Sequence, residues 1–183
     1  MPASGYLRLT MNVRTVYLGL GTNLSDRHAW LDQGLAALEE ALVARKSIQA
    51  MSMSPRYETE AWGMAAGTPA FLNMVVGVDT DMSLEALLCV LLDIEREHGR
   101  VRDASTEGYL NRTLDMDILC TSEGETLNID GLAVPHPRMT SRRFVLQPLA
   151  DLAPDLEVGG QSVRMALEAC PAVPGVVPVA TPS

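Results

Sequence analysis

Apolar residues first gather in a short run at residues 16–20, which predicts a strand. The polar turn GTNLSDR follows and offers Asn23, Ser25 or Asp26 as the N-cap of a helix. Leucines then recur at the spacing of one helix face, at Leu31, Leu35, Leu38 and Leu42. This spacing predicts an amphipathic helix over about residues 26–45, with one face on a core.

Two further strands and a second helix follow in the pattern. Residues 48–59 and 71–80 have the composition of strands, and the turn-rich segment EAWGMAAGTPA between them is too long for a tight hairpin. Ser83 is placed to cap a helix that ends at Gly99, a residue suited to the left-handed conformation that closes helices. A polar loop at residues 100–111 then leads to a last apolar run.

The order strand, helix, strand, strand, helix, strand is the split βαββαβ pattern. It predicts an α+β fold with a mostly antiparallel sheet and helices packed on one face. We expect a single domain over residues 1–183, with its core at about 14–158 and a short helix and tail at about 159–183. Because this fold supports many functions, it leaves the function open.

The last apolar run, RTLDMDILC at residues 112–120, contains two aspartates where a buried strand is expected. Strand side chains alternate between faces, so Asp115 and Asp117 share one face, roughly 6–7 Å apart. The opposite face should then carry Leu114, Met116, Ile118 and Cys120. Two like charges so close need solvent, arginine partners or a bound cation. Mg²⁺ is usually bound by one or two carboxylates plus substrate phosphates, so the pair fits a magnesium site.

The charge balance narrows the classes of ligand. A net charge of −9 argues against general binding of nucleic acid or of an anionic membrane. An anionic ligand therefore needs a local basic site, and half of the 14 basic residues are arginines close in sequence: Arg96, Arg100, Arg102, Arg112, Arg138, Arg142 and Arg143. These arginines either bind an anionic ligand or neutralise the acidic residues of the same stretch.

Length and composition indicate an ordinary soluble protein. The 183 residues are 47% hydrophobic and 20% charged, with neither a membrane-spanning run nor the apolar region of a secretory signal at the start. We therefore expect a cytoplasmic protein. Three widely spaced cysteines, Cys89, Cys120 and Cys170, lie in apolar surroundings without metal-ligand spacing, which predicts buried thiols.

Three alternative functions can be weighed against the motifs. GLGTNL lacks the spacing and the lysine of a phosphate-binding P-loop. A nucleotidyltransferase would place its carboxylate pair soon after a glycine-serine turn, whereas about ninety residues separate GLGTN from DMD here. A non-catalytic metabolite-binding module of this fold would explain the sheet, but it would need neither the aspartate pair nor the arginines.

Several other residues suit a binding site. His136 stands between two prolines in VPHPRM, with three arginines following it, and is either structural or a phosphate contact. Phe71 and Phe144, the two phenylalanines of the chain, either pack in the core or line a pocket. In a pocket they could sandwich a flat heterocycle, with Asn73 available to read its edge through paired hydrogen bonds.

Taken in order, these segments closely resemble the 6-hydroxymethyl-7,8-dihydropterin pyrophosphokinase family of folate biosynthesis. The resemblance runs over about residues 16–155 and rests on YLGLGTNLSDR, SPRYETEAWG, FLNMVV, IEREHGRVRD, NRTLDMDILC and VPHPRMTSRRFVLQPLADLAPD. It implies a ferredoxin-like fold and transfer of the terminal pyrophosphate of ATP to the hydroxymethyl oxygen of the pterin, with release of AMP. It also implies two Mg²⁺ ions, no nucleic-acid or membrane partner, and a monomer or weak dimer.

The resemblance also implies roles for individual residues. Asp115 and Asp117 correspond to the metal ligands, and Arg100 and Arg102 to loop arginines that close over the triphosphate. The residues that correspond to the nucleotide side of the site are Glu95, Arg112, Ile118, His136 and Arg142. Those that correspond to the pterin side are Thr59, Phe71, Asn73 and Phe144. The chain departs from the family pattern in two loops, at Glu60, Ala61, Trp62, Leu110 and Asn111.

Overall fold

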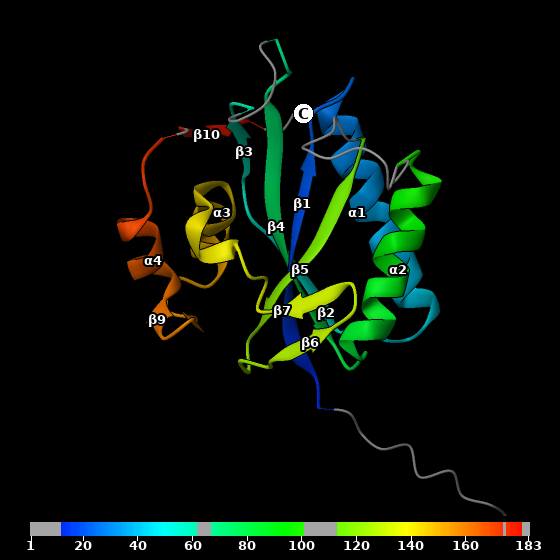
Figure 1. Cartoon of the computed structure of the whole chain (residues 1–183). Coiled ribbons are helices and arrows are strands. Elements are labelled where there is room, and N and C mark those ends of the chain that lie inside the picture. The colour runs from blue at the N-terminus through cyan, green and yellow to red at the C-terminus, as the bar shows by residue number, and fades with distance from the viewer. Residues whose placement is uncertain (1–11, 62–66, 101–112, 174, 181–183) are drawn as a thin grey trace, which may run out of the picture.

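A six-stranded antiparallel sheet forms the centre of the molecule (Figure 1). The computed structural model describes residues 12–61, 67–100, 113–173 and 175–180. Strand β1 (Arg14–Thr22) lies between β4 (Phe71–Thr80) and β5 (Asp115–Thr121), and it is antiparallel to both. The chain order up to β5 confirms the βαββαβ prediction when the two strands that replace the single predicted strand at residues 48–59 are counted together.

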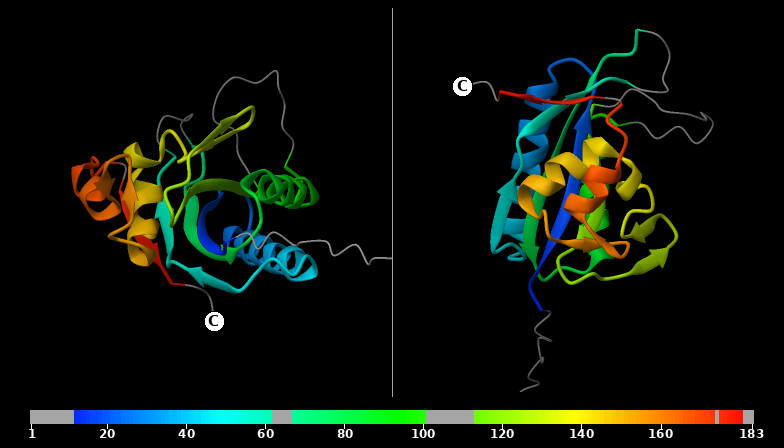
Figure 2. Two further views of the ribbon diagram at one scale, coloured as in Figure 1. Left: turned by 90° about the horizontal axis from the view of Figure 1, so that it is seen from below. Right: turned by 90° about the vertical axis from the view of Figure 1, so that its left-hand side faces the viewer.

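Helices cover both faces of the sheet, whereas the sequence predicted helices on one face only (Figures 1 and 2). The helices α1 (Arg27–Ala44) and α2 (Leu84–Glu97) pack on the first face, as expected. The second face carries α3 (Arg143–Leu152) and α4 (Val163–Ala169). The physical reason is that the central strands also place apolar side chains on their second face, which must be buried as well.

The two cores are separate layers on either side of the sheet. The first core joins α1 and α2 to the sheet through Leu18, Leu38 and Leu91, all fully buried. The second core joins α3 and α4 to the sheet and contains Tyr17 and Leu149. One polar contact adds to it: the Tyr57 hydroxyl donates a 2.7 Å hydrogen bond to the Asp151 carboxylate of α3, and burial together with this bond raises the pKa of Tyr57 to about 12.

The predicted helix starts are confirmed. Asp26 caps α1 by accepting a hydrogen bond from the Ala29 amide, 3.1 Å long, and Ser83 caps α2 in the same way from the Ala86 amide, 3.2 Å long. Gly99 closes α2 with φ of 80°, as its position predicted. Each cap satisfies an amide or carbonyl group that the helix itself leaves without a partner.

The single strand predicted at residues 48–59 is wrong, because the chain forms two strands there. β2 (Ala50–Met53) and β3 (Arg56–Thr59) are interrupted at Ser54 and Pro55. The Ser54 hydroxyl accepts a 3.0 Å hydrogen bond from the Val75 amide of β4, and proline has no amide hydrogen with which to continue the ladder. The side chain therefore replaces one regular bond of the sheet at the break.

The C-terminal tail contributes a strand that the sequence did not predict. β10 (Val176–Val179) pairs with β3 and becomes one edge of the sheet, opposite the edge formed by β5. Its Pro178 hid the strand from the pattern, although proline is tolerated where a strand lies at an edge. The remaining short elements are β6 (Leu127–Ile129), β7 (Leu132–Val134), β8 (Glu157–Val158), β9 (Gln161–Ser162) and a 3₁₀ turn at Met139–Ser141.

Two predictions about the cysteines need correction. Cys89 is exposed, whereas Cys120 and Cys170 are buried as predicted. Cys120 was expected on the face of Ile118 but belongs to the second core, because the pairing of β5 with β1 shifts by one residue at Leu119. This β-bulge inserts an extra residue, so the alternation of faces starts again after it.

Among the residues that the structure describes, no helix combines the length and the apolar character needed to cross a membrane.

We predict that Gly99→Ala lowers the free energy of unfolding by about 1 kcal/mol, because a side chain is strained in the left-handed region. No neighbouring atom lies within 4 Å of the added Cβ, so the loss comes from the backbone alone. Denaturant unfolding measures it. The matched control is Gly175→Ala, since Gly175 lies outside the left-handed region and is equally unobstructed. An equal loss in both variants would contradict the assignment.

Candidate active site

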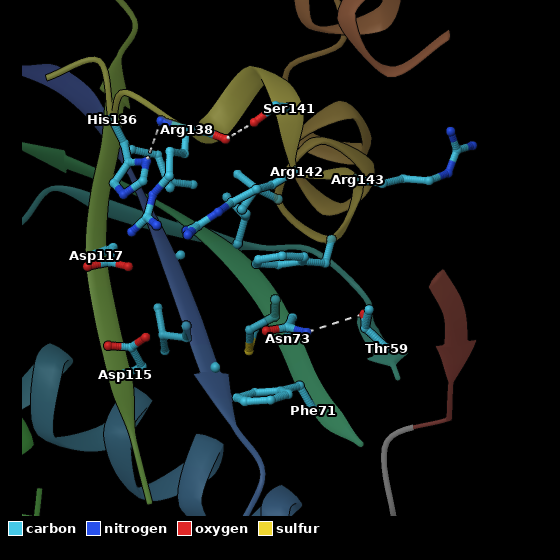
Figure 3. Close-up of a pocket in the computed structure, with 18 of the residues that line it drawn as sticks. Thr59, Phe71, Asn73, Asp115, Asp117, His136, Arg138, Ser141, Arg142 and Arg143 are labelled. Carbon is cyan, nitrogen blue, oxygen red and sulfur yellow. Dashed lines mark hydrogen bonds between the residues drawn. The ribbon is translucent and has the colours of Figure 1, made fainter. Parts of the chain in front are cut away.

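A cavity of about 600 Å³ lies on the second face of the sheet (Figure 3). Its walls come from β1, β3, β4 and β5, from the segment around His136, from the start of α3 and from the residues after α4. Of the predicted site residues, the cavity brings together Thr59, Phe71, Asn73, Arg100, Asp115, Asp117, His136, Arg142 and Phe144. Residues more than eighty positions apart in the chain thus share one site.

The floor of the cavity is bare backbone at the centre of the sheet. Gly19 and Gly21 of β1 line the cavity, and Gly21 lies between Asn73 of β4 and Asp115 of β5 in the strand register. A Cβ atom at Gly21 would come within 2.9 Å of the Asn73 Oδ1 atom. The glycines therefore leave room between the two flanking strands. Glycines alternating within a strand can indicate that another group approaches the backbone closely. From the sequence, GLGTNL was considered only as a P-loop, so the two glycines were not connected with a cavity.

The aspartate pair forms one side of the cavity. Asp115 and Asp117 both line it, and the intervening Met116 points into the opposite core, which confirms that the two carboxylates share a face. The guanidinium of Arg100 forms an ion pair with Asp115 and a second one with Glu95. For Asp115, an arginine partner thus compensates the burial of a carboxylate.

The end of α2 places Arg100 at this position. The Gly99 amide donates to the Arg96 carbonyl at 3.1 Å, and the Arg100 amide donates to the Glu95 carbonyl at 3.0 Å. These two bonds are the Schellman motif, which reverses the chain direction after a helix. The turn brings the Arg100 side chain back over the last turn of α2 and against β5.

Glu95 lies behind the cavity rather than in its wall. Its side chain is 2% exposed, and its Oε1 atom accepts hydrogen bonds from Arg100 and from the Met116 amide, the latter 2.8 Å long. A buried carboxylate needs such partners, because an unpaired charge in the interior is very costly. Glu95 therefore holds Arg100 and the aspartate strand together, whereas the resemblance implied a place on the nucleotide side.

His136 and the arginines after it form a cationic side of the cavity. The Val134–Pro135 peptide bond before His136 is cis, and the His136 amide donates a 2.7 Å hydrogen bond to the carbonyl of Leu119 at the bulge. The Arg138 amide donates to the His136 Nδ1 atom at 3.2 Å, which leaves Nε2 to carry the proton.

The electrostatics of His136 agree with a neutral ring. Burial lowers the pKa of His136, the Asp117 carboxylate opposes this shift, and Arg142 and Arg138 add to the lowering. At neutral pH the imidazole is therefore an uncharged N–H donor. Arg142 lies with its guanidinium carbon 5.6 Å from the centre of the Phe144 ring, so it bridges the cationic side and the aromatic side.

The aromatic side of the cavity lies toward β3 and β4. Phe71 and Phe144 both line it, so the pocket interpretation of the two phenylalanines holds, although Phe144 also packs against the second core. Asn73 lines the same cavity, and its amide nitrogen donates a 3.3 Å hydrogen bond to the Thr59 hydroxyl (Figure 3). This side offers flat apolar surfaces with a polar edge.

The remaining predicted residues either lie outside the cavity wall or fall outside the described residues. The side chain of Ile118 is 3% exposed and belongs to the first core, on the face opposite Asp117, because strand neighbours alternate. Arg102 and Arg112 fall outside the described residues, as do Trp62, Leu110 and Asn111. The sequence analysis did not assign Gly19, Gly21, Ser141 or Arg143 to the site, although all four line the cavity.

The described residues contain no cluster of three or more acidic, histidine or cysteine side chains that could hold a metal ion. The acidic side of the cavity therefore offers two carboxylates. Such a pair suits a hard cation that takes its other ligands from water and from a bound phosphate chain.

Comparison with known proteins identifies the family of the chain. The sequence model of the family described as 7,8-dihydro-6-hydroxymethylpterin-pyrophosphokinase (HPPK) matches residues 17–154. A relative from Methylorubrum extorquens named 2-amino-4-hydroxy-6-hydroxymethyldihydropteridine pyrophosphokinase is 40% identical over 151 residues, which cover 82% of this chain and 90% of the relative. A protein of the same name from Pseudomonas aeruginosa is 40% identical over 160 residues, covering 87% and 93%.

A solved structure supports the fold. The crystal structure of wild-type Plasmodium falciparum HPPK-DHPS with pteroate superposes with a TM-score of 0.62 at 16% sequence identity, over 86% of this chain. The chain spans 42% of that longer protein. On the family match and on the two bacterial relatives, the chain belongs to the 7,8-dihydro-6-hydroxymethylpterin-pyrophosphokinase family.

Proposed function

We propose that this protein transfers the terminal pyrophosphate of ATP to the hydroxymethyl oxygen of 6-hydroxymethyl-7,8-dihydropterin and releases AMP, as a step of folate biosynthesis. The observation that carries the proposal is the division of one cavity into two chemically different halves. One half has carboxylates and cationic donors, and the other has two phenylalanine rings and the amide of Asn73. Family membership supports the same reaction.

The aromatic half suits the pterin. A pterin is a flat heterocycle whose edge carries amide-like donors and acceptors, and Phe71 and Phe144 offer ring faces for it. The Asn73 side chain can both donate and accept along that edge, while its bond to Thr59 fixes its orientation. The bare backbone at Gly19 and Gly21 lets the hydroxymethyl group extend toward the carboxylates without a steric barrier.

The charged half suits the triphosphate of ATP. Asp115 and Asp117 would hold Mg²⁺, and we expect two ions, which would neutralise the charge of the phosphate chain. His136 and Arg142 are placed to donate to phosphate oxygens, since both line the same part of the cavity. Their contribution would be to orient the triphosphate of ATP, because phosphoryl transfer depends mainly on positioning and charge stabilisation.

Arg100 would have two roles, one in the protein without substrate and one during the reaction. Its guanidinium is shared between Glu95 and Asp115 at the border of the cavity. A phosphate oxygen close to Asp115 would compete for the same N–H groups, so Arg100 can move from the carboxylate to the transferred group without leaving its tie to Glu95. Arg102 would act with it according to the resemblance.

The direct experiment is to incubate the protein with ATP, Mg²⁺ and 6-hydroxymethyl-7,8-dihydropterin and to measure AMP. We expect AMP to form only when the pterin is present. A nucleotidyltransferase would release pyrophosphate instead, and a non-catalytic binding module would bind the pterin without forming AMP. Either of these results would overturn the proposal.

We predict that Asp115→Asn and Asp117→Asn each reduce turnover by at least about a hundredfold, because each removes an anionic metal ligand while keeping the side-chain volume. Steady-state kinetics over a range of Mg²⁺ concentrations measures the loss. The matched control is Asp130→Asn, on the exposed turn between β6 and β7, which should keep normal activity. Near-normal turnover in both site variants would remove the metal-ligand assignment.

We predict that Phe71→Leu and Phe144→Leu weaken pterin binding about threefold to tenfold, since ring contacts contribute roughly 0.5–1.5 kcal/mol beyond area burial. ATP affinity should change by less than about twofold. Titration calorimetry with each ligand separates the two effects. Normal pterin binding combined with a lower melting temperature would favour a purely structural role for the rings.

We predict that Arg100→Ala reduces the rate of the chemical step about tenfold to a few hundredfold, because a charge-assisted contact to the transferred group is lost. It should also lower the free energy of unfolding by about 3 kcal/mol, since the buried Glu95 carboxylate loses its arginine.

A double variant separates these two roles of Arg100. Adding Glu95→Gln to Arg100→Ala should restore much of the stability, because the buried charge is gone, without restoring the rate. Single-turnover kinetics and denaturant unfolding are compared across the set. Arg96→Ala is the control, because Arg96 is 72% exposed at the same end of α2 and pairs only with Asp93 in the described contacts. An unchanged chemical rate in the double variant would exclude Arg100 from the mechanism.

A further inference from the structure

Two neighbouring arginines at the start of α3 point in opposite directions (Figure 3). Arg142 extends toward the side of the cavity that carries Asp117, whereas Arg143 extends away from it. The Nη1 atom of Arg143 donates hydrogen bonds to the carbonyl oxygens of Leu167 and Cys170, both 3.1 Å long. Arg143 therefore acts on another part of the chain than Arg142 does.

The two carbonyls that Arg143 binds lie at the end of α4. The last carbonyls of a helix lack intrahelical partners, and a cationic side chain there both satisfies them and complements the helix dipole. The residues that follow directly, Cys170, Pro171 and Val173, line the cavity. Arg143 thus fixes the start of residues 170–173, which we call the wall segment. This segment lies outside the residues matched by the family model.

The wall segment is held at its other end by the sheet. β10 begins at Val176, which pairs with Thr59 of β3. Thr59 itself lines the cavity and accepts the hydrogen bond from Asn73. Among the described residues, the wall segment thus begins at the end of α4, and the chain enters the sheet beside the polar edge of the aromatic half.

The strand order shows which substrate the wall segment can influence. β10 and β5 are the two edges of the sheet, with β3, β4 and β1 between them. Adjacent strands lie about 4.8 Å apart, so β10 is roughly 19 Å from the strand that carries the aspartates. The described residues that follow the wall segment therefore enter the sheet beside Thr59, at the edge opposite the strand that carries the carboxylates.

We propose that Arg143 is a positioning residue for the pterin, the substrate that accepts the pyrophosphate. By binding the carbonyls of Leu167 and Cys170, it holds residues 170–173 as the outer wall of the aromatic half, and so it sets the affinity for the pterin and not for ATP. This inference rests on the proposed function. It adds a determinant of acceptor affinity in the C-terminal part of the chain.

The test compares three variants. Arg143→Met keeps the length of the side chain but removes its donors. Arg143→Lys restores several donors on one nitrogen, which suits this site because both hydrogen bonds come from the single Nη1 atom. Arg164→Met is the matched control, since Arg164 lies on α4 and its exposed pair with Asp155 does not contact the cavity.

We expect Arg143→Met to raise the KM for the pterin about fivefold to thirtyfold, as the loss of two charge-assisted hydrogen bonds allows. Its kcat and its Kd for ATP should stay within about twofold, Arg143→Lys should recover most of the affinity, and Arg164→Met should behave as the unaltered protein. A comparable loss of ATP affinity in Arg143→Met would instead assign Arg143 to the phosphate chain. An unchanged KM, or no rescue by lysine, would also overturn the proposal.

A measurement that does not depend on catalysis tests whether Arg143 holds residues 170–173 in place. Burial raises the pKa of the Cys170 thiol and Arg143 lowers it, so the proteins are compared at equal thiolate fraction. Under that condition the alkylation rate of Cys170 should rise in Arg143→Met, while that of Cys120, buried in the same core, should not. Equal rates for Cys170 in both proteins would contradict the holding role. If Arg143→Met does not fold, Val173→Ser decides, because Val173 is 74% exposed and its replacement leaves the cores intact.

Val173→Ser should raise the KM for the pterin about twofold to threefold and leave the ATP affinity unchanged. An unchanged KM for the pterin would refute the role of residues 170–173 as a wall of the aromatic half. Pterin-dependent AMP release by the unaltered protein is measured first. Its absence would refute the proposed function and this inference together. Normal release with insensitive variants would refute only the inference.

Discussion

The absence of side chains at Gly19 and Gly21 is the constraint on which the site depends. The central strand of a sheet is normally covered on both faces, and β1 is indeed covered at Tyr17 by the second core. Two and four residues further along, the same face presents only backbone, at Gly19 between Val75 and Asp117 and at Gly21 between Asn73 and Asp115. Any side chain there would meet its neighbours, so the cavity exists because this strand carries glycine at alternate positions. The aromatic half and the charged half therefore form one continuous cavity over the backbone of β1.

The charged half is stabilised where two carboxylates, Glu95 and Asp115, share one guanidinium. Glu95 is buried and bonded to the backbone of β5, and Arg100 links it to Asp115 at the cavity wall. The Schellman turn at the end of α2 places that arginine without a long loop. In a low-dielectric setting such pairs must be satisfied on every side, so the same contacts that support the fold also prepare the site for a charged ligand.

The second layer of helices completes the site. α3 is fixed to the sheet by the second core and by the bond between Tyr57 and Asp151. The cap residue Arg142 and the first turn of α3 therefore line the cavity together with β4 and β5. The segment after α4 then encloses the aromatic half from the side of β3. A fold with helices on a single face would leave this cavity as an open surface.

The sequence by itself determined what depends on local spacing. The order of elements, the caps at Asp26 and Ser83, and the shared face of Asp115 and Asp117 follow from the periods of helices and strands, and the family follows from ordered motifs. Nine of the residues that the sequence proposed for the site line the cavity, some proposed from their chemistry and others from the resemblance alone.

Only the tertiary structure decided what depends on long-range contacts. The bulge at Leu119 moved Cys120 to the other core, and alternation placed Ile118 away from the cavity where a motif comparison had put it on the nucleotide side. The partner of Arg143 lies 24 residues away, and the proline-containing tail becomes a strand only because β3 offers it an edge. Spacing along a chain fixes the direction of a side chain relative to its own element, whereas its partner is fixed by how the elements pack.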